Sequence, residues 1–359
     1  MSNICIISNT IKRFDETYLT KGCGGSETWV IKIAEALSNI GNNNITVICN
    51  CDTHKQNEKI SWYALPEFDS VIENNKFDVI LISRILIKEM TETFMKNDCH
   101  NLYLFAHDTY LVNDLSMPIL YTDLSDWEKK NIKKIFVLSE LHKQLFINEW
   151  KFPEKMIEIS ANGLDFELLE KYSNNDQRDN GILWSIRYER HFNVLADQLA
   201  PIIIKYIPDF KIYTCSYDTP LPNKYKNRNY IVDLGKLSKD ELYKEMSKHK
   251  VYFHPMLFFE TFCISILEAI MCGCNLVTGY NYGAATTLMP YKGFLLPNDI
   301  NYNNSKDRNM VASIILNSIF EYNSNENKAL RESMQTYLKN KYSWEKIAKD
   351  MLNVMNLKD

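Results

Sequence analysis

The polar run EKYSNNDQRDN, residues 170–180, separates two series of short apolar segments and thereby decides the organisation of the chain. This run offers almost nothing for a hydrophobic core to bury, so we expect it to link two domains. With 359 residues, the chain is also longer than one typical core requires. We therefore predict a first domain at 1–170, a linker at 171–180, a second domain at 181–340 and a final helix at 341–359.

On both sides of the linker, short β-branched and apolar runs alternate with longer helical patterns. Several runs are apolar throughout, as strands buried on both faces of a parallel sheet should be. The alternation predicts an α/β protein with two Rossmann-like, doubly wound domains, whose ligands bind beyond the carboxyl ends of the strands. Helices are expected at 190–206, 238–249 and 263–273. The predicted strands are NICIIS, NITVIC, FDVILIS, NLYLFAH, KIFVLS and KMIEIS before the linker, and GILWSI, KIYTCS, NYIVDLG, VYFHP, NLVTGY and GFLLP after it.

The composition is that of a soluble globular protein, with 45% hydrophobic residues, 24% charged residues and a formal net charge of −4. Such a charge argues against a nucleic-acid binder. The start MSNICIISNT lacks a secretory pattern, and no run approaches a membrane-spanning length, so we expect a cytoplasmic chain with at most peripheral membrane contact. The nine cysteines suit reduced, buried thiols, and no metal site is expected because CNC and CGC have no partner at zinc spacing.

Two loops of the first half carry residues suited to ligand binding. In KGCGGSETW, Gly24 and Gly25 precede a predicted helix, where backbone N–H groups can approach an anion or a sugar closely. A flexible turn with Ser26 as the helix cap is the alternative. In NLYLFAHDTY, His107 and Asp108 end a predicted strand and should point into the ligand crevice. A core histidine followed by a capping aspartate would give the same pattern.

In the second half, GILWSIRYERHFNVL runs from a predicted strand into Arg187 and Arg190 at the start of a helix. Cations are slightly unfavourable at a helix N-terminus unless an anion binds there too. Two arginines three residues apart could clamp a diphosphate through their guanidinium groups. Two solvated surface arginines are the alternative.

The run FFETFCISILEAIMCGC, residues 258–274, places Glu260 and Glu268 in very apolar surroundings. Eight helical residues span roughly 12 Å, which is too far for two carboxylates that share a proton and wide for a glycosidase acid/base pair. The two glutamates are therefore better placed to hold opposite ends of one elongated ligand. Because an uncompensated buried charge is expensive, Glu268 should face a polar partner or a cleft.

Taken together, these segments resemble a retaining glycosyltransferase of the GT-B fold, most closely glycosyltransferase family 4. The resemblance extends over the whole chain and implies two Rossmann-like domains that face a central cleft. It rests on GGSE, FAHDTY, VLSELHKQLFINEWKFPEKMIEISANGLD, the two arginines, ETFCISILEAIMCGC, YNYGAATTL and the closing YSWEKIAKDMLNVM. The last of these implies that the helix at 341–359 packs back on the first domain.

The resemblance implies that a nucleotide sugar lies mainly on the second domain. Glu268 would hold the ribose hydroxyls, Arg187 and Arg190 would bind the diphosphate, and Glu260 would bind the transferred sugar. Gly25 would approach the phosphate from the first domain. The implied donor-binding residues are Gly24, Gly25, Arg187, Arg190, Glu260, Phe262, Cys263, Glu268, Gly283, Ala284 and Ala285. The implied catalytic residues are Glu260, His107, Arg187 and Arg190, with His107 and Asp108 on the acceptor side.

The resemblance further implies transfer with retention at the anomeric carbon, without a metal ion or another cofactor. The departing diphosphate develops negative charge, for which two arginines and a helix N-terminus near Cys263 are suitable. We expect a UDP-sugar donor first and a GDP-sugar second. The acceptor would be a glycan, a lipid-linked sugar (a glycolipid) or a protein that becomes a glycoprotein.

Three positions depart from the usual family pattern, which has Gly where Cys263 stands, often Lys where Arg190 stands and often Glu near Thr286. These departures could change which sugar fits or reduce activity, but they leave the arginine pair in place. One alternative is a catalytically inactive GT-B-fold protein that only binds a nucleotide sugar or a partner. A nucleotide-sugar epimerase or a phosphorylase is another, although we find no cofactor-lysine loop of a phosphorylase.

Overall fold

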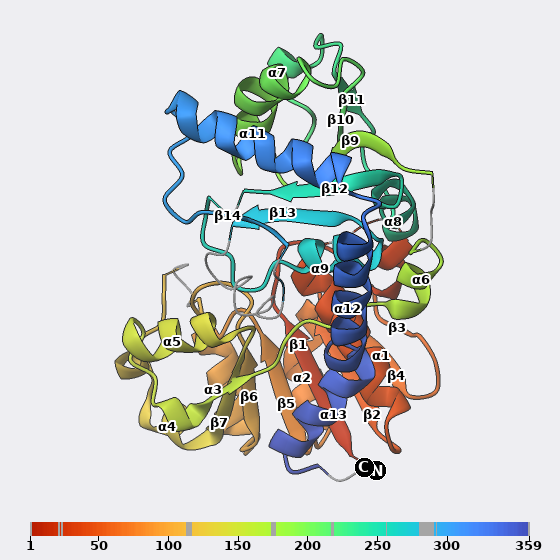
Figure 1. The fold of residues 1–359 in the computed structure, drawn as a ribbon. Helices are drawn as coiled ribbons and strands as arrows, with labels where there is room; N and C mark the ends of the chain where they lie inside the picture. The colour runs from red at the N-terminus through yellow and green to blue at the C-terminus, as the bar shows by residue number, and fades with distance from the viewer. Residues whose placement is uncertain are drawn as a thin grey trace. The chain divides into compact units, whose positions relative to one another are not determined.

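The computed structural model describes residues 2–20, 22, 24–112, 117–173, 177–216, 219–255, 257–279, 291 and 293–357 (Figure 1). The chain divides into two compact units. The first comprises Met1–Tyr18, Cys23–Gly163 and Tyr342–Asp359, and the second comprises Leu19–Gly22 and Leu164–Lys341. None of the described helices combines the length and the apolarity that crossing a membrane requires.

The first unit contains an eight-stranded sheet in the order β3-β4-β2-β1-β5-β6-β7-β8. Its strands pair in parallel except for β3 and β4, which are antiparallel. The six strands predicted for this half are confirmed, whereas β3 and β4 were missed because they form a partly exposed edge that lacks a continuous apolar run. The strands are β1 (Asn3–Ser8), β2 (Asn44–Cys49), β3 (His54–Lys55), β4 (Ile60–Ala64), β5 (Val79–Ser83), β6 (Leu102–Phe105), β7 (Ile132–Val137) and β8 (Ile157–Ile159).

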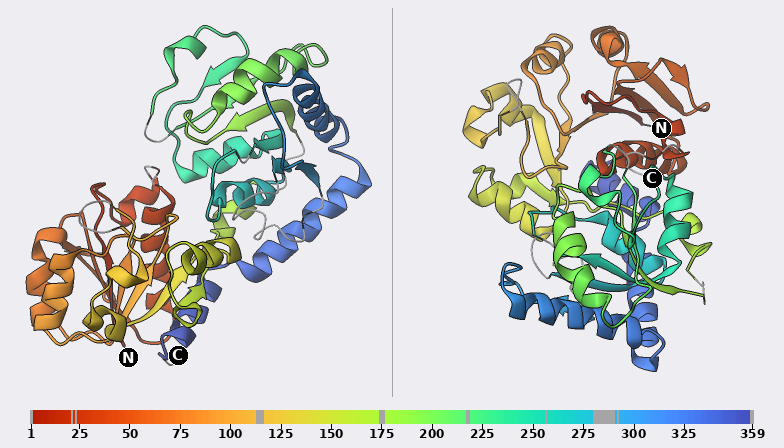
Figure 2. Two further views of the ribbon diagram at one scale, coloured as in Figure 1. Left: turned by 90° about the vertical axis from the view of Figure 1, so that its left-hand side faces the viewer. Right: turned by 90° about the horizontal axis from the view of Figure 1, so that it is seen from above.

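Helices pack against both faces of this sheet. On one side, α1 contacts β1, β2 and β4, and α13 lies against α1, as Figures 1 and 2 also show. Cys5 and Ile7 of β1 point to the other side, where they join a buried cluster with apolar residues of α2, α3 and α5. The helices are α1 (Gly25–Asn39), α2 (Phe68–Asn74), α3 (Lys88–Lys96), α4 (Asp126–Asn131), α5 (Glu140–Asn148) and α13 (Trp344–Val354), with 3-10 turns η1 (Glu16–Thr20), η2 (Leu65–Glu67), η3 (Tyr121–Asp123) and η4 (Glu154–Met156).

The second unit contains a six-stranded parallel sheet in the order β11-β10-β9-β12-β13-β14. All six strands predicted for this half are confirmed. They are β9 (Asp179–Trp184), β10 (Ile212–Thr214), β11 (Ile231–Asp233), β12 (His249–His254), β13 (Asn275–Gly279) and β14 (Phe294–Leu296). The helices are α6 (Phe166–Glu170), the π-helix η5 (Val194–Leu199), α7 (Ala200–Ile203), α8 (Lys239–Met246), α9 (Ile264–Met271), α11 (Ser305–Phe320) and α12 (Asn325–Lys341), with the 3-10 turn η6 (Asn223–Tyr225).

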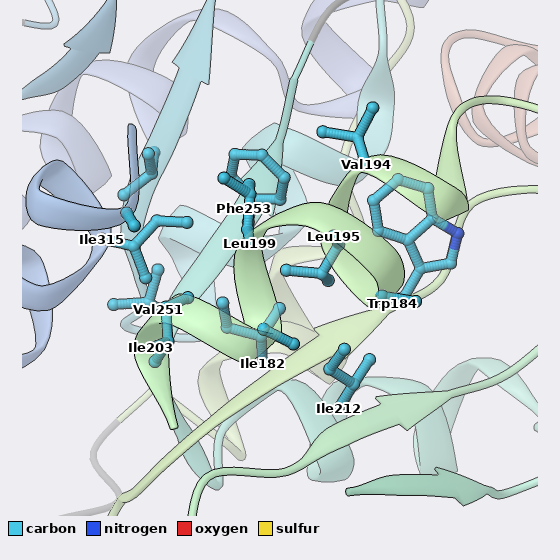
Figure 3. Close-up of a cluster of buried hydrophobic side chains, with 14 of the residues drawn as sticks. Ile182, Trp184, Val194, Leu195, Leu199, Ile203, Ile212, Val251, Phe253 and Ile315 are labelled. Carbon is cyan, nitrogen blue, oxygen red and sulfur yellow. The ribbon is translucent and has the colours of Figure 1, made fainter. Parts of the chain in front are cut away.

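In this unit α7 and α11 cover one face of the sheet, and α8 and α9 lie on the opposite face (Figure 1). The predicted helix at 190–206 is a turn followed by the π-helix η5 and the short α7. Pro201, inside α7, has no N–H to donate to the preceding turn, which accounts for the departure from regular α-helix. The core beneath α7 and α11 is shown in Figure 3. Its labelled members are Ile182, Trp184, Val194, Leu195, Leu199, Ile203, Ile212, Val251, Phe253 and Ile315.

The predicted boundary at residue 170 is wrong by a few residues, because the first unit's long segment ends at Gly163. Helix α6 belongs to the second unit, where it packs against α9 and where Lys339 Nζ lies 2.7 Å from Glu170 Oε1. The predicted linker also runs too far, since β9 already begins at Asp179. Polar residues can start this strand because they have partners, such as the His249 Nδ1 that lies 2.6 Å from Asp179 Oδ1.

Candidate functional site

In the second unit, an arginine and a glutamate meet beyond the ends of the neighbouring strands β9 and β12. Arg190 Nη1 donates a hydrogen bond to Glu260 Oε1 at 2.6 Å, and its guanidinium lies 4.4 Å from the centre of the Phe258 ring. The backbone N–H of Arg190 donates to the Arg187 carbonyl at 3.0 Å, which fixes the turn that carries both arginines. Both arginine side chains are exposed. The predicted pair therefore offers positive charge to solvent beside a carboxylate.

Glu260 is more enclosed than its partner, since 18% of its side chain is exposed against 44% for Arg190. Burial raises the pKa of Glu260 above its ordinary value, although the positive charge of Arg190 acts in the opposite direction. The ion pair is thus the main stabilisation of this carboxylate. An anion that draws Arg190 away would leave Glu260 ready to accept hydrogen bonds from neutral hydroxyl groups.

Helix α9 starts directly after this pair. Cys263 is its N-cap and has a left-handed backbone, with φ 59° and ψ 71°. Glycine adopts this conformation without strain, which gives a physical reason for the glycine that the resemblance implies at this position. Phe262 and Cys263 are both buried. Any contact that they make with a ligand would therefore come mainly from their backbone groups.

Glu268 lies within α9 and is only 2% exposed. Its Oε1 atom accepts hydrogen bonds from Lys239 Nζ and from the Tyr243 hydroxyl, each at 2.6 Å. The structure thus supplies the polar partners that a carboxylate in this apolar run requires. Neither Lys239 nor Tyr243 was predicted from the sequence as a partner of Glu268. Their four-residue spacing on a predicted helix was the available signal, but only the fold brings α8 against α9.

His254, Glu260 and Cys263 form a group whose potential ligand atoms lie within 4.8 Å of one another. Burial and the nearby Arg190 lower the pKa of His254 to about 3, so the imidazole is neutral at ordinary pH. Burial raises the pKa of the Cys263 thiol. Because the Arg190 guanidinium already binds the Glu260 carboxylate, we interpret Glu260 as the partner of this arginine rather than as a ligand of a metal ion.

In the first unit, a second group gathers beyond the ends of the neighbouring strands β5 and β6. Arg84 follows β5 and donates from Nε to Asp108 Oδ2 at 2.9 Å and from Nη1 to Ser26 Oγ at 3.3 Å. His107 Nε2 lies 3.1 Å from Ser83 Oγ. Burial, with the positive charge of Arg84, lowers the pKa of His107 well below its ordinary value. The predicted His107–Asp108 pair is therefore a neutral imidazole beside a carboxylate held by an arginine.

Arg84 was not predicted from the sequence. Its backbone is left-handed, with φ 74°, which is uncommon for a residue with a side chain and is often found at functional sites. The available signal was a cation placed directly after the predicted strand FDVILIS. Its partner, Asp108, stood at the end of the next strand, and parallel pairing of β5 with β6 brings the two together.

Helix α1 begins at Gly25 with Gly24 as its N-cap and without a hydrogen bond from a capping side chain. The alternative in which Ser26 caps the helix is therefore wrong. Ser26 instead contacts Arg84 and Glu27. A Cβ atom added at Gly25 would meet nothing within 4 Å, so a ligand has room to approach this backbone. The predicted sugar-site residues Gly283, Ala284 and Ala285, together with Thr286, lie outside the described residues.

Residues 221–328, within the second unit, match the family described as Glycosyl transferases group 1. No curated protein matches the chain.

Solved structures of similar fold include a glycosyltransferase from Rickettsia africae, with 16% identity and a TM-score of 0.72 over 99% of this chain and 98% of that one. Sucrose-phosphate synthase from Thermosynechococcus elongatus has 15% identity and a TM-score of 0.69 over 99% and 98% of the two chains. HepE of Anabaena, solved with UDP and glucose, has 14% identity and a TM-score of 0.67 over 99% and 100%.

These similarities identify the fold as GT-B, in which each domain is an α/β unit built on a parallel sheet. The sequence match over 221–328, on a chain with this fold throughout, indicates a glycosyltransferase.

Proposed function

We propose that this glycosyltransferase moves a sugar from a nucleotide-sugar donor, with a UDP-sugar favoured over a GDP-sugar, and retains the configuration at the anomeric carbon. The observation that carries the proposal is the exposed Arg190 guanidinium bonded to Glu260 at the start of α9. Glu260 and Glu268 both lie in the segment that matches the glycosyltransferase family. The similar fold of HepE, whose structure contains UDP and glucose, supports a nucleotide-sugar donor.

The proposed donor site uses the exposed charges of the second unit. Arg187 and Arg190 would bind the diphosphate and stabilise the negative charge that it gains as it leaves. Paired guanidinium donors suit phosphate oxygens better than a single ammonium would. Released from Arg190, Glu260 would accept hydrogen bonds from hydroxyl groups of the transferred sugar. The N-terminus of α9, an eight-residue helix, would add a favourable dipole.

Glu268 would bind the ribose hydroxyls of the donor. Its carboxylate is held by Lys239 and Tyr243 through one oxygen, Oε1. The other oxygen, Oε2, takes no part in these two bonds.

The first unit would present the acceptor. The acceptor is a sugar hydroxyl on a glycan or a lipid-linked sugar, or a hydroxyl on a protein. Asp108, whose side chain is 44% exposed, could accept a hydrogen bond from such a hydroxyl, while the neutral His107 could donate or accept one. The acceptor oxygen would attack the anomeric carbon on the face that the diphosphate leaves, which gives retention without a protein nucleophile.

The reaction as proposed requires no metal ion, because arginine side chains supply the positive charge that a diphosphate leaving group needs. A protein that only binds a nucleotide sugar would not need groups that stabilise a leaving diphosphate, whereas this chain has both arginines and both glutamates. We therefore favour the enzyme, and we place it in the cytoplasm with at most peripheral membrane contact.

The direct test combines binding with turnover. A panel of UDP- and GDP-sugars is screened by thermal shift, since a ligand that binds only the folded state raises its melting temperature. Each stabilising sugar is then incubated with the protein in excess EDTA, and release of nucleoside diphosphate is measured. Release in EDTA supports the metal-independent transferase. Stabilisation without release, with or without divalent cations and an acceptor panel, would instead identify a binding protein.

A further inference from the structure

Lys239 and Tyr243 lie one helical turn apart on α8, and both bind Glu268 on α9. The lysine ammonium and the tyrosine hydroxyl donate to the same oxygen, Oε1, each at 2.6 Å. The ammonium also lies 5.5 Å from the centre of the Tyr243 ring. These three residues form one connected group, which we call the α8–α9 cluster.

The α8–α9 cluster is largely buried. Glu268 is 2% exposed, Tyr243 is 3% exposed, and 20% of the Lys239 side chain is exposed. Buried ion pairs are often no more stabilising than well-packed apolar residues of similar volume, because both charges must leave water. Helices α8 and α9 could therefore pack through apolar side chains alone, and the charged cluster calls for another explanation.

The position of Lys239 in α8 is also not explained by helix stability. It is the first residue of α8, where the helix dipole disfavours a cation. The helix start is already capped, because Ser238 and Glu241 exchange hydrogen bonds in a capping box. Burial and the charge of Glu268 raise the pKa of Tyr243 well above its ordinary value, so its hydroxyl keeps its proton. The Tyr243 hydroxyl thus stays a donor to Glu268, beside the bond from Lys239.

We propose that Lys239 and Tyr243 are positioning residues that fix the Glu268 carboxylate so that Oε2 faces the ribose hydroxyls of the donor. The inference rests on the ribose role proposed above for Glu268. With Oε1 held by two donors, the carboxylate is preorganised and loses little rotational freedom when the nucleotide binds. Without them, the carboxylate would turn, and its ribose contacts would weaken.

The test compares two ligands that differ only at the ribose. Affinities for UDP and GDP are measured by calorimetry, and the tighter nucleotide is then compared with its 2′,3′-dideoxy counterpart. Tyr243→Phe and Lys239→Met should each weaken binding of the ribonucleotide about tenfold, as loss of a hydrogen bond to a charged group predicts. Binding of the dideoxy nucleotide should change less than about twofold, because the affected contact is absent there.

Matched controls separate positioning from general damage. Tyr225→Phe removes another tyrosine hydroxyl bonded to a carboxylate in the same unit, Asp197 at 3.0 Å, and should not affect either nucleotide. Lys244→Met removes an exposed lysine from the same helix. Lys239→Arg keeps a charged donor and should restore most of the ribonucleotide affinity. Circular dichroism and melting temperature establish that each variant is folded.

The outcomes are distinguishable. Equal losses for the ribonucleotide and the dideoxy nucleotide would show that Lys239 and Tyr243 only support the fold, and would overturn the inference. If Glu268→Gln selectively weakens the ribonucleotide but Tyr243→Phe and Lys239→Met do not, the ribose role stands and the positioning role fails. Should Glu268→Gln weaken neither ligand, the ribose role fails, and the positioning role fails with it. If the wild type binds neither nucleotide, the proposed function itself fails. In a Glu268→Gln background, Tyr243→Phe should cause no further loss. If Tyr243→Phe does not fold, the comparison of wild-type Lys239 with Lys239→Met and Lys239→Arg tests the positioning role instead.

Discussion

Both units contain an ion pair between an arginine and a carboxylate that follow two neighbouring strands, but the pairs differ in which partner is exposed. In the first unit Arg84 follows β5 and pairs with Asp108, which follows β6. In the second unit Arg190 follows β9 and pairs with Glu260, which follows β12. In the first unit the carboxylate is the more exposed partner, with 44% of its side chain exposed against 30% for the arginine. In the second unit the order is reversed, with 18% for the carboxylate and 44% for the arginine.

The exposed partner determines which ligand each pair can receive. An exposed guanidinium attracts an anion such as a diphosphate, whereas an exposed carboxylate accepts hydrogen bonds from hydroxyl groups. A neutral imidazole lies beside each arginine, His107 in the first unit and His254 in the second, and burial lowers the pKa of both. The difference between the units therefore supports a donor site on the second unit and an acceptor site on the first.

The strongest test of this division is the double substitution Arg187→Ala with Arg190→Ala. It should reduce release of nucleoside diphosphate by at least about a thousandfold, because two charge-stabilising groups are lost together. The measurement is steady-state donor turnover, with melting temperature as the check on folding. Arg228→Ala is the control, because Arg228 also pairs with a carboxylate of this unit, Asp197 at 2.6 Å, without a proposed role in donor binding. Near-normal turnover in the double variant would place the diphosphate site elsewhere.

A second test uses the buried histidine of the donor side. Burial, with the charge of Arg190, lowers the pKa of His254 to about 3 in the folded state, below the value of about 6.5 expected when unfolded. The unfolded chain therefore binds a proton first as the pH falls, so this group's contribution to stability is present above pH 6.5 and is lost between about 6.5 and 3.

The free energy of unfolding should fall by about 2 kcal/mol less between pH 7 and pH 5 in His254→Gln than in the wild type, as the linkage between proton binding and folding predicts. Urea unfolding at the two pH values measures the difference, and the comparison within each variant cancels the cost of the substitution itself. His142→Gln provides a match in the first unit, where burial lowers the pKa of His142 to about 4. An unchanged pH dependence in His254→Gln would mean that His254 is not buried in its neutral form.

The third test concerns the first unit. Arg84→Ala should reduce transfer to a sugar acceptor about tenfold, because Asp108 loses its charged partner and its fixed position. Hydrolysis of the donor by water and the affinity for nucleotide should stay close to wild type, since no donor role is proposed for Arg84. Product formation with a panel of sugar acceptors is measured alongside donor hydrolysis. A parallel loss of hydrolysis and transfer would contradict the division between the units.

The sequence predicted the sheets more fully than the contacts of the site. Continuous apolar runs identified twelve strands because burial on both faces leaves a strong pattern, while the partly buried β4, next to the edge strand β3, left a weak one. Position after a strand singled out Arg190, His107 and Asp108 as candidate ligand-binding residues. The structure places each of them beside another polar group, and their binding roles stay predictions. The side-chain pairs of the site could not be predicted from the sequence. Arg84 is 24 residues from Asp108, and Lys239 is 29 residues from Glu268. Only the order of the parallel strands brings the first pair together, and only helix packing brings the second pair together.

The smallest expected effect concerns Cys263, where the chain departs from the pattern of the family that it resembles, beside the proposed leaving group. Its left-handed backbone costs a residue with a side chain roughly 1–2 kcal/mol, which glycine avoids. Glycine in turn gains about 0.4–1 kcal/mol of freedom in the unfolded chain. Cys263→Gly should therefore leave the free energy of unfolding within about 1 kcal/mol of wild type.

The same substitution should leave donor turnover within about threefold, because the backbone groups that face the donor keep their conformation. Cys263→Val supplies the contrast, since a β-branched residue is strongly disfavoured at positive φ and should lower both stability and turnover. Urea unfolding and donor hydrolysis measure the two effects. If glycine were as damaging as valine, the buried thiol rather than the turn geometry would be what the site requires of this position.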